Sequence, residues 1–65
     1  MQIYLNGELA DTSCQTLLQL VHSLALNGKR FAVEVNEMIV PKSKLEHTMI
    51  SDQDRIEIIH AVGGG

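Results

Sequence analysis

The residues best suited to chemistry are the last three, Gly63, Gly64 and Gly65, which carry no side chains and end in a carboxylate. Three extended residues reach roughly 10 Å and, without Cβ atoms, can enter a channel too narrow for other residues. Adenylation by ATP would turn the Gly65 carboxylate into a mixed anhydride that sulfur or nitrogen nucleophiles attack. No ATP-binding motif occurs in the sequence, so a partner enzyme would have to activate it. We predict a flexible tail over residues 63–65 that acts through Gly65; the alternative is a terminus without function.

The other side chains indicate no catalytic or metal site. His22, His47 and His60 are too widely spaced to act together as metal ligands on one turn of a helix. Cys14 has no catalytic partner nearby in the sequence, so we expect a small, partly buried core thiol. The acidic residues are scattered over strands and turns without the spacing of a carboxylate pair. We therefore expect no catalytic residue, no metal, no bound cofactor and no enzymatic activity.

Length and composition limit the class of protein. The 65 residues can hold one small core, which we place in a single domain over residues 1–62. A net charge of −3, with one Phe, one Tyr and no Trp, argues against nucleic acid binding. The N-terminus lacks a secretory signal pattern, and no stretch approaches membrane-spanning length. We expect a cytoplasmic protein that does not contact membranes.

Alternating apolar and polar residues predict several short strands. Residues 2–5 run into Asn6-Gly7, a dipeptide that suits a two-residue hairpin, and residues 8–11 form the returning strand. Residues 31–36 alternate next, and residues 38–40 form a short strand that Pro41 ends or confines to a sheet edge. Residues 55–58 alternate again.

One helix is predicted between the first hairpin and the third strand. Apolar residues recur there at helical spacing, over about three turns: Leu17, Leu20, Val21 and Leu24. Thr16 and Gln19 have the spacing of a capping box at its start. Asn27-Gly28 is expected to close the helix, because glycine suits the left-handed position after a helix.

These elements predict an α+β fold of the β-grasp, or ubiquitin-like, type. Four to five strands form a mixed sheet with one main helix packed on one face, and the final strand lies parallel to the first in the middle. The turn-rich residues 42–54 are expected to be anchored by Leu45, Met49 and Ile50. Because Ile56 and Ile58 face the helix, Ile59 must point to the open face, where it is a candidate docking residue together with Val62. The alternative is that a neighbouring side chain covers Ile59.

With these features the sequence resembles the ThiS family of ubiquitin-like sulfur carriers of thiamine biosynthesis. The resemblance runs through all 65 residues. It is carried by the Asn6-Gly7 hairpin, by residues 35–42 (VNEMIVPK) and by residues 52–65 (DQDRIEIIHAVGGG).

The resemblance implies a carrier that acts as a protein co-substrate. A ubiquitin-activating-like adenylyltransferase of the ThiF type would use Mg-ATP to adenylate Gly65, and a persulfide donor would convert it to a thiocarboxylate. The tail, with Gly63 and Gly64, would then enter a thiazole synthase of the ThiG type and donate sulfur for the thiazole ring. Three alternatives stay open: a sulfur carrier for molybdopterin synthesis, a ubiquitin-like modifier conjugated through Gly65, and a plain interaction module.

Overall fold

The computed structural model describes residues 1–26 and 28–60. The predicted domain boundary at residue 62 and the predicted tail over residues 63–65 lie outside the described residues. The described elements are β1 (Gln2–Leu5), β2 (Glu8–Asp11), α1 (Leu17–Ser23), β3 (Phe31–Val35), β4 (Met38–Val40), the 3-10 helix η1 (Lys42–His47) and β5 (Arg55–His60). None of the helices in these two ranges is long and apolar enough to cross a membrane.

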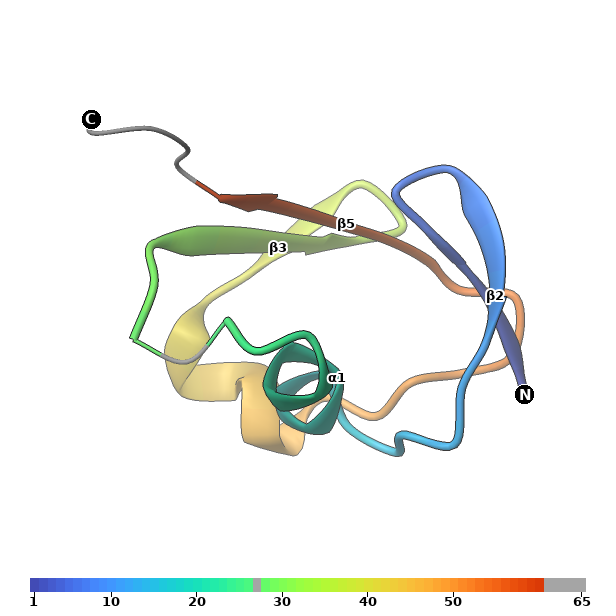
Figure 1. Cartoon of the computed structure of the whole chain (residues 1–65), viewed down its shortest axis with the longest axis horizontal. Coiled ribbons are helices and arrows are strands. Elements are labelled where there is room, and N and C mark those ends of the chain that lie inside the picture. The colour runs from blue at the N-terminus through green and yellow to red at the C-terminus, as the bar shows by residue number, and fades with distance from the viewer. Residues whose placement is uncertain (27, 61–65) are drawn as a thin grey trace.

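The five strands form one mixed sheet in the order β2-β1-β5-β3-β4. Strand β5 runs parallel to β1 and antiparallel to β3, so the prediction of a central final strand is confirmed. Figure 1 shows α1 and η1 together on one side of this sheet, and no described helix covers the other face, which we call the open face. This is the predicted β-grasp arrangement.

Two tight hairpins, one on each side of β5, set the register of the strands that they connect. Asn6 and Gly7 connect β1 to β2 with φ angles of 51° and 84°. Asn36 and Glu37 connect β3 to β4 in the same way, with φ angles of 51° and 71°. Positive φ at both loop residues matches the right-handed twist of the flanking strands. The hairpin at Asn6-Gly7 is therefore confirmed, and Pro41 follows the edge strand β4, as expected.

Helix α1 contributes one apolar face to the core. Leu17, Leu20 and Val21 are buried, and they pack with apolar residues from the sheet, from the segment after α1 and from the segment after β4: Ile3, Leu26, Val33, Leu45, Ile50, Ile56 and Ile58. The predicted capping box is present, because the Gln19 N–H donates to Thr16 Oγ1 at 3.2 Å and the Thr16 N–H donates to Gln19 Oε1 at 3.4 Å. Burial of these side chains is the main stabilising term for so short a helix.

The helix ends earlier than its periodicity predicts. Leu24 caps it and is 40% exposed, whereas the core position passes to the buried Leu26. The Ala25 N–H donates to the His22 carbonyl at 3.0 Å, and the Leu26 N–H reaches back to the Val21 carbonyl at 3.3 Å. These two bonds, with Ala25 left-handed at φ 58°, form a Schellman turn. The predictions that Leu24 is a core residue of the helix and that Asn27-Gly28 ends the helix were therefore wrong. Gly28 is left-handed, but it comes after the Schellman turn, and Asn27 lies outside the described residues.

The loop from residue 42 to residue 54 keeps two of its three predicted anchors. Leu45 and Ile50 are buried, but Met49 is 61% exposed. The cause is local pairing, since the Leu17 N–H donates to the Thr48 carbonyl and the Ile50 N–H donates to the Gln15 carbonyl. An extended segment alternates its side chains, so burying Ile50 turns Met49 outward.

Replacing Ala25 by glycine should raise the free energy of unfolding by up to about 1 kcal/mol, because glycine adopts left-handed φ without the Cβ clash of alanine. Gly28→Ala is the reciprocal variant, since a Cβ built there meets nothing within 4 Å. Because the backbone there is left-handed, Gly28→Ala should lower the free energy of unfolding by about 1 kcal/mol. Urea unfolding followed by circular dichroism measures both. A less stable Ala25→Gly variant would contradict the turn described above.

Candidate functional site

The candidate site begins at β5, the strand from which the chain continues at residue 61. Gly63, Gly64, Gly65 and Val62, which the sequence predicts as the tail and its docking neighbour, lie outside the described residues. Ile59 and the strand that positions it are described. The described part of the candidate site therefore consists of β5 and the surfaces beside it.

Strand β5 is paired very differently along its two edges. Its antiparallel partner β3 accompanies it to the end, where Phe31 lies opposite His60. Its parallel partner β1 pairs with it only at its start, where Tyr4 lies opposite Arg55 and Leu5 lies opposite Ile56. In Figure 1 β5 correspondingly extends past the β1–β2 hairpin in the direction of the C-terminus.

Asn6 extends the pairing on the β1 side. Its backbone N–H donates to the Ile56 carbonyl at 2.9 Å, and its side-chain Oδ1 accepts from the Ile58 N–H at 2.9 Å. The side chain thus takes the place that the next residue of β1 would occupy if the strand did not turn. The left-handed φ of 51° that makes the hairpin also directs this amide toward β5.

Asn36 performs the corresponding task on the β3 side. Its backbone N–H donates to the Arg55 carbonyl at 2.8 Å, and its Oδ1 accepts from the Arg55 N–H at 3.0 Å. Its Nδ2 donates to Asp54 Oδ1 at 3.0 Å, while Asp54 Oδ2 accepts from the Ser51 N–H at 2.8 Å. Sequence reasoning identified Asn6 only as a turn residue and missed these side-chain contacts. The available signal was asparagine at the first loop position of both hairpins.

Ile59 points to the open face of the sheet and is 57% exposed. Its neighbours Ile56 and Ile58 are buried on the helix side, so the predicted direction of Ile59 is confirmed and the alternative of a covered side chain is contradicted. The exposed Ala32 lies directly opposite Ile59, and Ile39 on β4, 72% exposed, lies on the same face. We call Ile59, Ala32 and Ile39 the open-face patch.

The histidines, the cysteine and the acidic residues of the described ranges do not gather at one place. Across residues 1–26 and 28–60, no three His, Cys, Asp or Glu side chains are grouped in a way that could hold a metal ion. Cys14 is half-buried and packs against the core, as its sequence position predicted. His47 contacts the neighbouring Glu46 at 3.3 Å, and both side chains are exposed.

Comparison with known proteins relates the whole chain to one protein family. A model of the ThiS family matches residues 2–65. The uncharacterized protein ycf40 of Porphyra purpurea is 41% identical over 66 residues, which cover 100% of this chain and 93% of that protein. The sulfur carrier protein ThiS of Bacillus subtilis is 40% identical over 50 residues, which cover 77% of this chain and 76% of that protein. A thiazole synthase of Paramagnetospirillum magneticum is 36% identical over 66 residues, which cover 100% of this chain but 20% of that protein.

A solved structure shares the fold over its entire length. The crystal structure of a thiamine biosynthesis protein (ThiS) from Geobacter metallireducens matches with a TM-score of 0.82 at 22% identity, covering 100% of both chains. This likeness confirms the β-grasp fold.

Asn6→Gly should keep the left-handed turn while removing the acceptor for the Ile58 N–H, at a cost of about 1 kcal/mol in the free energy of unfolding. The Ile58 amide should then exchange with solvent faster than the Glu57 amide, which lies on the edge that faces β3. Amide hydrogen exchange followed by NMR measures this. In the matched variant Asn36→Gly, the faster amide should be that of Arg55. An unchanged Ile58 exchange rate in Asn6→Gly would refute the role given to Asn6.

Proposed function

The chain belongs to the ThiS family of sulfur carrier proteins of thiamine biosynthesis, and we propose that it carries sulfur on the carboxyl group of Gly65. The observation that supports this most directly is that the family match continues to residue 65 and therefore includes the glycine ending. Strand β5 donates hydrogen bonds to side chains on both edges and ends at His60, in the part of the chain that leads to Gly65.

The chemistry would proceed by activation and substitution at one carbon atom. The Gly65 carboxylate attacks the α-phosphorus of ATP and releases pyrophosphate, which gives an acyl adenylate. The terminal sulfur of a persulfide then attacks the acyl carbon and displaces AMP, and a further thiol reduces the resulting acyl disulfide to a thiocarboxylate. Sulfur is more polarizable than oxygen, so the thiocarboxylate is the better nucleophile. The carrier acts as a co-substrate in these steps, and Mg-ATP and the catalytic groups belong to its partners.

Two partner enzymes would receive the tail. One is an adenylyltransferase of the ThiF type, which works with a persulfide donor; the other is a thiazole synthase of the ThiG type, which accepts the sulfur. The thiazole synthase of Paramagnetospirillum magneticum supports the second partner, because one fifth of that protein resembles this entire chain. Carrier-like and synthase portions thus occur in one polypeptide. Gly63 and Gly64 would pass through narrow channels in both partners, since glycine has no Cβ to clash with the walls.

The open-face patch would be where these partners dock. Ile59 lies two residues before Ala61 and presents an apolar surface on the strand that leads to the tail. Exposed apolar residues gathered on one face are typical of protein interaction sites. Val62 would extend this contact toward the channel entrance.

Incubation with the activating enzyme of the same organism, Mg-ATP, cysteine and a cysteine desulfurase should convert the chain to a thiocarboxylate. Intact-protein mass spectrometry should then show a gain equal to the exchange of one oxygen for sulfur. A chain lacking Gly65 is the control and should show no gain. If the native chain gains no mass with an enzyme that charges its own carrier, Gly65 is not a sulfur acceptor.

Ile59→Asp should weaken docking and lower the rate of adenylation at subsaturating carrier by about tenfold, because loss of a well-placed interface residue costs 1 kcal/mol or more. Leu9→Asp is the matched control, since Leu9 is also 57% exposed but lies on the far edge strand β2. Both variants should keep the native unfolding midpoint. Pyrophosphate release measures the rate, and equal rates for the two variants would remove Ile59 from the docking surface.

A further inference from the structure

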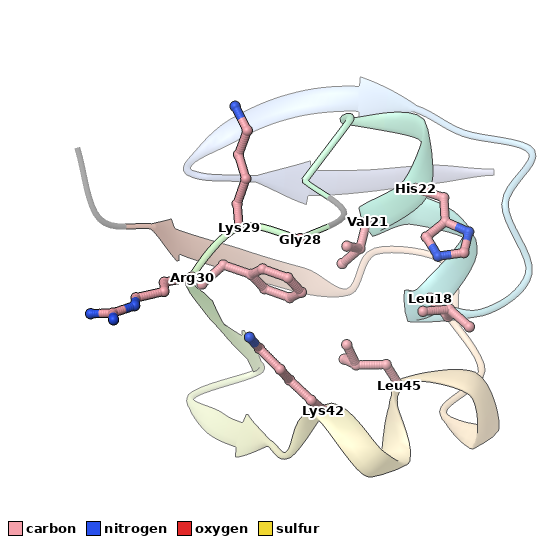
Figure 2. A pocket seen from close by; sticks show the side chains of 9 residues that line it. Leu18, Val21, His22, Gly28, Lys29, Arg30, Lys42 and Leu45 are labelled. Atoms are coloured by element: carbon pink, nitrogen blue, oxygen red, sulfur yellow. The ribbon is translucent and has the colours of Figure 1, made fainter. Parts of the chain in front are cut away.

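A pocket of about 570 Å³ opens between α1, β3 and η1, on the side of the sheet opposite the open-face patch. We call it the α1–β3 pocket. Its apolar lining comes from the buried Val21 and Leu45 and the half-buried Leu18 and Phe31. Figure 2 shows Leu18 and Val21 on the helix and Leu45 on η1 around one hollow.

The rim of this pocket carries most of the positive charge of an acidic protein. Lys29, Arg30 and Lys42 line it, which is three of the five Lys and Arg residues in the chain, and the remaining lining residues include no Asp or Glu. Lys42 Nζ lies 4.5 Å from the centre of the Phe31 ring. In Figure 2 the side chains of Lys29 and Arg30 extend outward from the rim. An apolar floor under a cationic rim fits a large apolar side chain flanked by carboxylates.

The pocket lies beside the strand that leads to the tail. Phe31, which lines it, is paired with His60 at the end of β5. The next residue, Ala32, faces the other side of the sheet, where it belongs to the open-face patch opposite Ile59. The open-face patch and the pocket therefore lie on opposite faces of β3, beside the end of β5.

We propose that the α1–β3 pocket is a second docking site, filled by an acidic segment of the thiazole synthase that inserts a large apolar side chain. This inference rests on the proposed function of the tail. A protein segment suits the site better than a small molecule, because ligand sites bury most of their ligand whereas this pocket is open to solvent. The thiazole synthase is the occupant because proteins of that name contain a segment similar to this chain.

Charge reversal at the rim tests the proposal with a matched pair of variants. Lys42→Glu changes a pocket residue, and Lys44→Glu makes the same change on an exposed residue of η1 that is not part of the pocket. Isothermal titration of each full-length chain with the thiazole synthase of the same organism should give a Kd raised about tenfold or more for Lys42→Glu and less than about twofold for Lys44→Glu. Added NaCl should weaken binding of the native chain more than binding of Lys42→Glu. Equal affinities for the two variants would overturn the proposal.

Cross-linking identifies what occupies the pocket. A photoreactive amino acid in place of Lys29, irradiated with the purified thiazole synthase, should attach to a peptide in which Asp or Glu stands beside a large apolar residue. Attachment to a basic or wholly polar peptide would overturn the proposal. A second combination of results would also overturn the proposal: inorganic phosphate alone gives saturable NMR shifts of the amides of residues 29–31, and the Lys42→Glu variant binds the synthase normally. The pocket would then be a site for a free anion.

The failure of this inference can be told apart from failure of the proposed function. Native chain and both variants should all be thiocarboxylated at saturating activating enzyme, as read by intact mass. If the native chain is charged and binds the synthase, but Lys42→Glu binds equally well, only the pocket assignment fails. If the native chain is not charged or does not bind the synthase, the proposed function fails and the pocket assignment falls with it.

Discussion

Strand β5 lies in the middle of the sheet, so its backbone needs hydrogen-bonding partners on both edges. Its neighbours β1 and β3 come from distant parts of the chain. The contact between Asn6 and Ile58 spans 52 residues of sequence. Both hairpins turn beside β5, and each places an asparagine amide against its backbone. The two turns therefore have a double role, since they reverse the outer strands and also complete the pairing of the central one. The position of β5 also fixes where the open-face patch and the α1–β3 pocket lie.

Local chemistry predicted those parts of the fold that local interactions decide. Asn6-Gly7 and the Thr16–Gln19 capping box depend on neighbours within a few residues, and both occur where the sequence placed them. The end of α1 depends instead on a competition between Leu24 and Leu26 for one core position. Helical periodicity counts Leu24 as a core residue, but it does not show that a left-handed alanine places Leu26 against the sheet.

The candidate site likewise has one part that the local sequence predicted and one part that it did not. The alternation of Ile56, Ile58 and Ile59 was sufficient to place Ile59 on the open face, because a strand has a fixed period of two. The α1–β3 pocket had no comparable signal. Its cationic rim joins residues 29 and 30 to residue 42, and only the packing of η1 beside α1 and β3 brings them to one opening. Charges that are unremarkable along the sequence thus become a local concentration of one sign within a protein of net charge −3.

The pairing of β5 also determines how the molecule responds to a mechanical load. A pull on residue 60 along the strand axis is transverse to the hydrogen bonds that join β5 to β3, to β1 and to the two asparagine side chains. These bonds would have to break together rather than one after another, and shear of this kind resists force far better than unzipping. A partner that pulls on the chain beyond residue 60 would therefore load all of these bonds at once, rather than peel β5 from its neighbours one bond at a time.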